Sequence, residues 1–206
     1  MAVVKKIVAI VGTYRKGRVI DTAVSEVLLG AWDGGATTQT IYLIDKHIEF
    51  CTNCRTCMQQ ADVGRRGRCV LDDDMEEILR ATDEADGLVL ASPVNFYNVT
   101  AVTRRFMERL VGHAYWPWGQ PAPKVRDKTQ NKRAVTITSS ACPAFFARIA
   151  MPGGIKALKA IAETLGAKVQ TSLLFGMVAQ SPEATLNKKD RAKAYQAGRR
   201  LVDSLA

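Results

Sequence analysis

The stretch VVKKIVAIVGTYRKGRVI, residues 3–20, decides the fold of this chain of 206 residues. Its first half, Val3 to Val11, is a nearly continuous run of β-branched and apolar side chains, which is typical of a strand buried on both faces. From Val19 to Leu29 apolar residues recur at helical spacing, with Asp21 in the first turn, where a negative charge suits the helix dipole. We therefore expect a strand, a short loop and a helix in succession.

The same succession recurs along the rest of the chain. Further strands are predicted at Thr38–Ile44, Gly87–Ala91, Arg133–Thr138 and Val169–Phe175. Further helices are predicted at Asp74–Thr82, Ala101–Val111, Gly153–Leu165 and Lys188–Leu205. Because parallel neighbours need a right-handed crossover, this alternation predicts an α/β fold, a doubly wound five-stranded parallel sheet with helices on both faces. The natural strand order is 2-1-3-4-5, the flavodoxin-like three-layer α/β/α arrangement.

The composition limits the classes of protein to be considered. With 47% hydrophobic and 24% charged residues, the chain is close to an average globular protein, and disorder is excluded as a description of the whole. The length predicts one domain over residues 1–206, with a cysteine-containing loop at 51–69 and a long surface loop at 116–131.

The sequence also bears on the location and the partners of the protein. No stretch approaches the roughly 18 consecutive apolar residues of a membrane-spanning helix, and the first residues lack the order of a signal peptide. We therefore expect a cytoplasmic protein without a membrane span. The net charge of +9 favours phosphate-bearing ligands, but a basic balance alone does not indicate nucleic-acid binding, and no nucleic-acid partner is expected.

Two loops are the candidate ligand site, because ligands of an open parallel sheet bind where the strand order reverses, here between the first and third strands. Residues 12–20 combine a hydroxyl, three cations and the N-terminus of a helix, the ingredients of a phosphate site. Residues 92–98 could offer apolar and backbone surface to a planar ring. Taken alone, the first could equally be a solvated basic loop, and the second an ordinary turn with core aromatics.

Three of the five cysteines form the motif Cys51-x-x-Cys54-x-x-Cys57, which is unlike the disulfide framework of a secreted protein. This spacing lets one loop wrap three thiolates around a cubane cluster whose fourth ligand comes from elsewhere, and Cys69 is the candidate fourth ligand. Three interpretations stay open: metal-free thiols, which we favour, a [4Fe-4S] cluster, and a zinc site of four thiolates.

Five motifs occur in a fixed order: Gly12-Thr-Tyr-Arg-Lys-Gly17, the cysteine motif, Cys69-Val-Leu-Asp-Asp-Asp-Met75, Ala85-Asp-Gly87 and Ser92-Pro-Val-Asn-Phe96. In this order they resemble the NADPH-dependent FMN reductase and iron-sulfur flavoprotein family, over residues 3–112 and more loosely beyond. The resemblance implies a flavodoxin-like fold that binds FMN and uses NAD(P)H as co-substrate.

The resemblance also implies the residues of a phosphate site. Thr13 stands where the family has a phosphate-binding serine, Arg15 and Lys16 match an Arg-Lys pair, and Gly17 fits the tight turn. The family often has Asn-Thr where this chain has Val19-Ile20, so backbone N–H groups would replace two side-chain donors.

The ring of the flavin is expected at the other two loops. By the same resemblance, Pro93, Val94, Asn95 and Phe96 would lie along the isoalloxazine and ribityl, with Asn95 where a tyrosine is more usual. Ser139 and Ser140 would bring N–H and hydroxyl groups to the flavin edge. No catalytic side chain is expected, because hydride transfer from the nicotinamide to the flavin is chemistry of the cofactor.

The function expected from the resemblance is an FMN-dependent NAD(P)H oxidoreductase of the flavin or quinone reductase type. It would pass electrons to a small-molecule acceptor, as a homodimer or homotetramer. One alternative is an iron-sulfur flavoprotein for electron transfer, which would receive its electrons from a carrier. Another is a non-catalytic thiol redox sensor on the same fold.

Overall fold

A parallel sheet forms the centre of the computed structural model, which describes residues 4–205. Its strands are β1 (Lys6–Val11), β2 (Thr37–Tyr42), β3 (Gly87–Ala91), β6 (Lys132–Ser139) and β7 (Ala167–Phe175). They lie in the order β2-β1-β3-β6-β7, and every neighbouring pair is parallel. The predicted order 2-1-3-4-5 is therefore confirmed. The predicted start of the first strand, Val3, lies outside the described residues.

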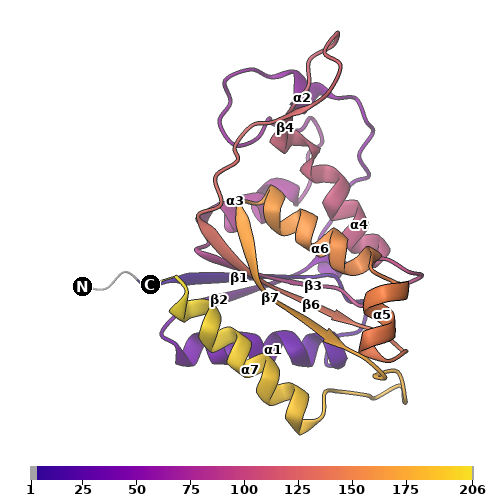
Figure 1. Ribbon diagram of the computed structural model, residues 1–206. Helices are drawn as coiled ribbons and strands as arrows, with labels where there is room; N and C mark the ends of the chain where they lie inside the picture. The colour runs from indigo at the N-terminus through magenta and orange to yellow at the C-terminus, as the bar shows by residue number, and fades with distance from the viewer. Residues whose placement is uncertain (1–3, 206) are drawn as a thin grey trace.

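Helices cover both faces of the sheet (Figure 1). On one face lie α1 (Val19–Asp33) and α7 (Lys188–Asp203), and on the other α3 (Met75–Glu84), α4 (Ala101–Glu108) and α6 (Gly153–Thr164). Along β1, Ile7, Ala9 and Val11 pack on the α1 side, whereas Val8 and Ile10 pack on the α3 side. Both faces of β1 are thus buried, which explains its continuous apolar run.

Several boundaries differ from the predicted ones. The second strand ends at Tyr42, because Leu43–Asp45 turns into a 3-10 helix, η1. The helix after β3 ends as α4 at Glu108 and continues as a 3-10 helix, η2 (Arg109–His113). A helix that was not expected, α5 (Ala144–Ala150), buries only Ala147 and therefore shows no apolar stripe of helical period.

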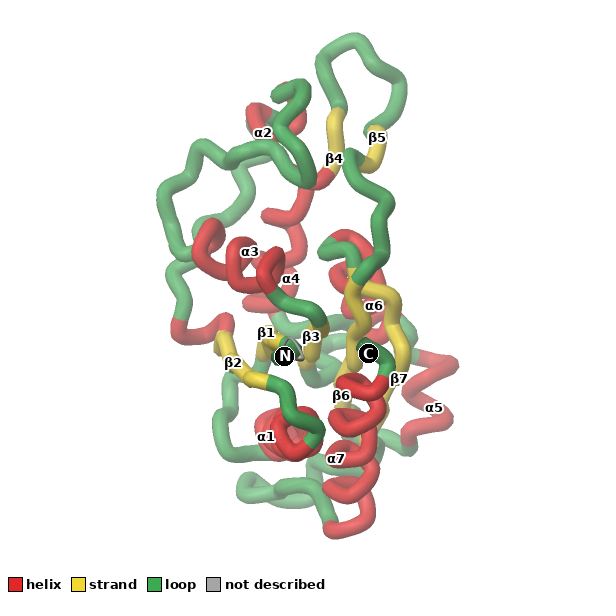
Figure 2. The backbone as a smooth tube through the Cα atoms, turned by 90° about the vertical axis from the view of Figure 1, so that its left-hand side faces the viewer, coloured by secondary structure: helices red, strands yellow, loops and turns green. Residues whose placement is uncertain are grey.

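Two segments, residues 49–73 and 114–127, project together from the α3–α4 side of the sheet, as Figures 1 and 2 show. We call them the cysteine lobe. It contains α2 (Thr56–Gln59) and the antiparallel pair β4 (Ala114–Tyr115) and β5 (Lys124–Val125). The backbone N–H of Trp116 donates to the Met58 carbonyl at 2.8 Å and joins the two segments. The predicted long loop 116–131 includes the exposed two-residue strand β5.

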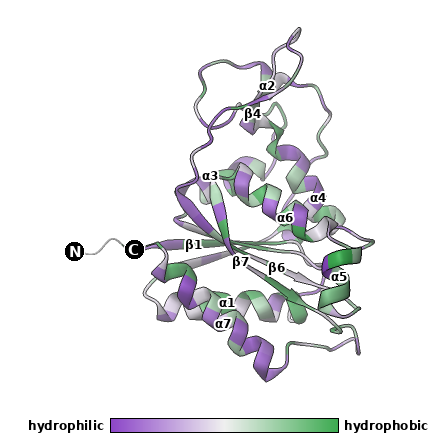
Figure 3. Cartoon of the chain, in the orientation of Figure 1, coloured by the Kyte–Doolittle hydropathy of each residue, from purple (hydrophilic) through white to green (hydrophobic). Residues whose placement is uncertain are grey.

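The helices on the surface of the molecule differ in the hydropathy of their residues (Figure 3). Helix α7 carries many hydrophilic residues, whereas the short helix α5 is coloured mostly as hydrophobic although most of its side chains are exposed. Between residues 4 and 205, no helix combines the length and the apolar character needed to cross a membrane.

Candidate functional site

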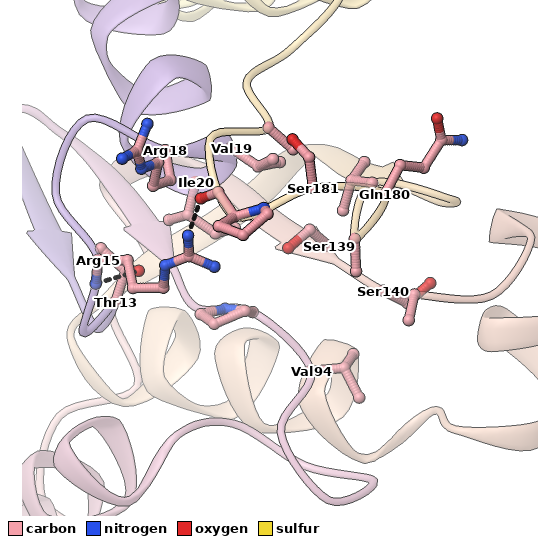
Figure 4. Close-up of a pocket in the computed structure, with 16 residues that line it drawn as sticks. Thr13, Arg15, Arg18, Val19, Ile20, Val94, Ser139, Ser140, Gln180 and Ser181 are labelled. Carbon is pink, nitrogen blue, oxygen red and sulfur yellow. Dashed lines mark hydrogen bonds between the residues drawn. The ribbon is translucent and has the colours of Figure 1, made fainter.

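A cavity of about 610 Å³ lies at the carboxyl ends of the strands, and its size is in the range of small-molecule sites. It is bordered by the loops that follow β1, β3, β6 and β7 (Figure 4). The residues lining it are Thr13, Arg15, Arg18, Val19, Ile20, Pro93, Val94, Ser139, Ser140, Ala141, Val178, Ala179, Gln180, Ser181, Pro182 and Ala184. The cavity is thus at the predicted place, where the strand order reverses between β1 and β3.

One end of the cavity is suited to an anion. Arg18 is the N-cap of α1, and its side chain, which has no acceptor atom, does not cap the first helical turn. The N–H groups of that turn therefore stay open to a negatively charged ligand, which the helix dipole also favours. Thr13, whose hydroxyl oxygen accepts the Arg15 N–H at 3.2 Å, and the Arg15 guanidinium border the same end. This end fits a phosphate group.

Both arginines also hold the segment that follows β7. The Arg15 Nη2 donates to the Pro182 carbonyl, drawn as a dashed line in Figure 4, and the Arg18 Nη1 donates to the Glu183 carbonyl at 3.4 Å. Residues 178–184 therefore form a wall of the cavity. Sequence reasoning missed this wall, and the only signal for it was its place after a strand of the parallel sheet.

The other end of the cavity is more apolar, with Pro93 and Val94 after β3, and with Ser139 and Ser140 at the end of β6. The Val94 N–H donates to the Ser139 carbonyl at 2.8 Å, and the Ser140 N–H to the Phe175 carbonyl at 2.9 Å. The Ser140 hydroxyl turns to the Cys142 carbonyl at 2.8 Å. The Ser139 hydroxyl, by contrast, is not hydrogen-bonded to any of these three carbonyls.

Two predicted residues of the first loop lie outside this cavity. Lys16 forms an ion pair with Asp45 and lies 4.6 Å from the centre of the Tyr42 ring. Gly17 has a positive φ of 73°, and its N–H donates to an Asp21 carboxylate oxygen at 2.5 Å. The Tyr42 hydroxyl donates to the same carboxylate, and burial together with Asp21 raises the pKa of Tyr42 to about 12. A cofactor role for Lys16 and Gly17 stays a prediction.

Two predicted residues of the third-strand loop also lie outside the cavity. Asn95 and Asn98 exchange backbone hydrogen bonds of 2.7 and 3.2 Å, closing a turn with Phe96 and Tyr97 at its tip. Both tip residues have positive φ, 46° and 68°, which is rare for aromatic residues. Phe96 is 93% exposed, so its side chain points to solvent, and its contact with a flavin stays a prediction.

A buried network of hydroxyl groups holds the loops after β1 and β3 together. The Thr100 hydroxyl donates to the Gly12 carbonyl at 2.6 Å and lies 2.8 Å from the Thr103 hydroxyl. The Thr100 N–H donates to the Ser92 hydroxyl at 3.1 Å. Since hydrogen-bonded buried groups resist displacement, this network fixes the positions of the two loops, which both border the cavity.

The predicted metal ligands lie in the cysteine lobe. Cys51, Cys54, Cys57 and Cys69 are free thiols that line one small cavity of about 20 Å³. Cys57 and Cys69 also line an adjoining cavity of about 380 Å³. In the part of the chain that the structure describes, no three histidine, cysteine or acidic side chains are gathered to hold a metal ion. A zinc ion would need its sulfurs about 2.3 Å away, whereas a four-iron cubane spreads its thiolates farther apart.

The four thiols have unlike surroundings. Hydrogen bonds from Thr56 lower the pKa of the Cys54 thiol, and burial raises the pKa of the Cys57 thiol. The Nη2 of Arg109 donates to the Cys69 sulfur at 3.4 Å. Burial opposes the charge of Asp73, but hydrogen bonds from Arg109 and from backbone N–H groups hold its pKa below the usual range. A cation is therefore fixed beside the thiols.

Sequence comparison agrees with the resemblance. Residues 5–150 match the family model of NADPH-dependent FMN reductase. An iron-sulfur flavoprotein of Archaeoglobus fulgidus is 34% identical over 116 residues, which cover 54% of this chain and 48% of the relative. One of Methanocaldococcus jannaschii is 35% identical over 104 residues, covering 50% and 51%. The chain thus matches about half the length of these curated relatives.

Solved structures show the fold. The chain is similar to an azoreductase of Bacillus anthracis, with a TM-score of 0.69 and 12% identity over 97% of this chain and 99% of that one. It is similar to a NAD(P)H:quinone oxidoreductase of Methanothermobacter marburgensis, with a TM-score of 0.68 and 14% identity over 99% and 100%. A flavodoxin from the domain Archaea gives 0.56 and 12% over 97% and 98%. The fold is flavodoxin-like, and by its sequence the chain belongs to the NADPH-dependent FMN reductase family.

Proposed function

We propose that the chain is an FMN-dependent NAD(P)H oxidoreductase of the flavin or quinone reductase type, which reduces a small-molecule acceptor. The observation that carries the proposal is the cavity at the carboxyl ends of the strands, which is cationic at one end and apolar at the other. FMN has the matching chemistry, a phosphate at one end and a planar ring at the other.

Each end of the cavity has residues for one part of FMN. The phosphate would bind the first-turn N–H groups of α1, the Thr13 hydroxyl and the guanidinium groups of Arg15 and Arg18. The ring would lie against Pro93 and Val94 and beside the Ser139 hydroxyl. Bound FMN would accept a hydride from the nicotinamide and deliver electrons to the acceptor.

The residues around the cavity support a function without acid-base catalysis. Among the described residues 4–205, its lining includes no aspartate, glutamate, histidine, lysine or cysteine side chain. The protein would hold the phosphate, orient the ring and exclude water, and the cofactor would supply the redox chemistry.

The first test is a visible absorption spectrum of protein purified without oxygen, followed by titration with FMN and then with NADPH or NADH. We expect a bound-flavin spectrum that bleaches on addition of the nicotinamide. Arg15→Ala should weaken FMN binding by about 1 to 3 kcal/mol, because a charge-assisted contact with the phosphate is lost. Arg148→Ala, on the exposed face of α5, is the matched control. A chain that binds no flavin after reconstitution would overturn the proposal.

A second candidate function is that of an iron-sulfur flavoprotein in electron transfer. Four free cysteines on one cavity, beside the buried cation of Arg109, favour it, and the curated relatives carry that name. We expect roughly four irons per chain after anaerobic reconstitution. A thiol redox sensor would instead give reversible thiol oxidation without iron and without consumption of NAD(P)H.

A further inference from the structure

Two arginines on the cysteine cavity have buried N–H groups without an acceptor. Arg55 and Arg109 both line this cavity together with the four cysteines. The Nε atom of each is buried and has no hydrogen-bond partner within residues 4–205, and Arg105 is the one other residue there with such an atom. Because buried donors in native proteins nearly always have an acceptor, these two groups indicate that an acceptor belongs in or beside this cavity.

The Arg55 side chain is held in place by two tryptophans, Trp116 and Trp118, which follow β4. Its guanidinium lies 4.0 Å from the centre of the Trp116 ring and 4.0 Å from that of Trp118, a double cation–π contact. Its Nη2 donates to the Trp116 carbonyl at 2.7 Å. The side chain is thus fixed inside the cysteine motif, between Cys54 and Cys57 in sequence, while its Nε remains unused.

The Arg109 side chain is held in place by Asp73 and by the backbone of Glu49. It forms an ion pair with Asp73, and both side chains are only 1% exposed. Its Nη1 also donates to the Glu49 carbonyl at 2.9 Å, and its Nη2 contacts the Cys69 sulfur at 3.4 Å. The Arg109 guanidinium is therefore fixed in place, and one of its N–H groups already donates to the sulfur of Cys69.

We propose that Arg55 and Arg109 are the hydrogen-bond donors to an anionic iron-sulfur cluster held by Cys51, Cys54, Cys57 and Cys69, and that they raise its reduction potential. The proposal rests on the second candidate function. Uptake of one electron from an external reductant adds one negative charge to the cluster, with no bond made or broken. Fixed positive charge and N–H···S hydrogen bonds stabilise that more negative state, so they favour reduction.

The chemistry of the cavity agrees with such a ligand. A bound cluster would supply sulfur acceptors for both unused Nε groups and would place its charge against two cations rather than in an apolar interior. A single metal ion would bind the same thiolates but would bring no sulfide, so it would offer the arginines fewer sulfur acceptors than a cluster does.

The test uses the whole chain, reconstituted without oxygen with ferrous iron and sulfide, and measures iron content and the reduction potential by EPR-monitored titration with dithionite. Arg55→Met keeps the aliphatic stem between the tryptophans but removes the charge and all donors. We expect this variant to lower the ratio of reduced to oxidised cluster at a fixed potential by at least about tenfold, which is about 59 mV for a one-electron couple. Arg55→Lys, which keeps the charge but not the planar donors, should lie in between.

The matched control is Lys124→Gln, which removes a positive charge from an exposed strand of the same lobe, outside the cavity. Its potential should equal that of the wild type. Equal potentials for Arg55→Met and Lys124→Gln would overturn the proposal. Because a neutral residue at 109 would leave Asp73 buried without its partner, Arg109→Lys is the second variant, and it should also lower the potential.

The outcomes separate this inference from the functions on which it depends. A wild-type chain that takes up no iron and sulfide overturns both the cluster and the role of the arginines, whereas the flavin titration tests the reductase function on its own. If Arg55→Met folds, as judged by circular dichroism, but loads no cluster while Lys124→Gln loads it fully, the role of Arg55 as a partner of the cluster is supported.

Discussion

Gly12 stands at the end of β1 where no side chain has room. A Cβ atom on this residue would lie 1.7 Å from the Thr103 hydroxyl and 3.3 Å from the Thr100 hydroxyl. The backbone after β1 therefore packs directly on the start of α4. This close approach brings the loop after β1 beside the loop after β3, and both border the cavity.

We expect Gly12→Ala to destabilise the protein by about 1 to 3 kcal/mol, because the methyl group displaces Thr103 and breaks its hydrogen bond with Thr100. Urea denaturation of the single variants and of the double variant with Thr103→Ala measures the effect. If the clash is the cause, Gly12→Ala costs less in the Thr103→Ala background. An equal cost in both backgrounds would contradict this explanation.

His113 is expected to make the stability dependent on pH. Burial lowers the pKa of its imidazole, whose Nδ1 lies 3.0 Å from the Leu110 carbonyl. In the unfolded chain the imidazole titrates at about pH 6.5, so below that pH the unfolded state binds a proton that the folded state resists. The free energy of unfolding should therefore fall between pH 7.5 and pH 5.5. Urea denaturation should show a smaller fall for His113→Gln, and an identical fall would contradict the assignment.

At the scale of elements, the start of β6 is tied to the end of α3 by a buried lysine. The Nζ of Lys132 donates to the carbonyls of Thr82, Asp83 and Ala85 at 2.7, 2.6 and 2.8 Å. These carbonyls lie at the C-terminal end of the helix, where the dipole favours a positive charge. Burial lowers the pKa of Lys132, and the three hydrogen bonds compensate for the loss of water.

Lys132→Met should lower the free energy of unfolding by about 1 to 3 kcal/mol, because it leaves these carbonyls without their donor. Denaturation in urea measures the change. Lys159→Met is the control, since Lys159 is a largely exposed residue of α6. A Lys132→Met protein as stable as the control would show that the three hydrogen bonds contribute nothing net.

The elements that could be predicted from the sequence are those whose pattern is set by burial. Strand β3 was predicted with both its ends correct, because all of its residues are buried and the run is continuous. Helix α5 was not predicted, since exposed apolar side chains give no period, and β5 has only two residues. Such elements depend on contacts with distant segments, which a local pattern does not contain.

The same limit applies to the candidate site. The loops after β1, β3 and β6 were predicted because the ends of parallel strands meet at one edge. Residues 178–184 were not, since their role as a wall depends on Arg15 and Arg18, which lie far away in sequence. The turn closed by Asn95 and Asn98 leaves the Phe96 side chain exposed, and its expected contact with a flavin stays a prediction.

At the scale of the molecule, apolar side chains are exposed at two neighbouring places. On α5, Phe145, Phe146 and Ile149 are 71%, 51% and 79% exposed. The turn with Phe96 and Tyr97 lies next to the start of α6, where the Tyr97 carbonyl lies close to Gly153. Exposed apolar groups of this kind mark surfaces where proteins associate.

This surface supports the expectation of a homodimer or homotetramer, which stays a prediction. We expect light scattering of the purified protein to give a mass of at least two chains. Ile149→Ser together with Phe145→Ser should reduce that mass, because the apolar contact is lost. Lys159→Ser is the control on an exposed face of α6. A wild-type protein that stays monomeric at high concentration would contradict the prediction.

The cysteine lobe is built from two segments that leave the ribosome at different times. All four cysteines are synthesised before Arg109, and Trp118 follows Cys69 by 49 residues. At the usual rate of synthesis this interval lasts about 2 to 10 s. During it the thiols exist without the tryptophans that hold Arg55 and without the cation at Cys69. The nascent cysteines therefore acquire their enclosed surroundings only once translation has passed Trp118, which places the maturation of this lobe after that moment.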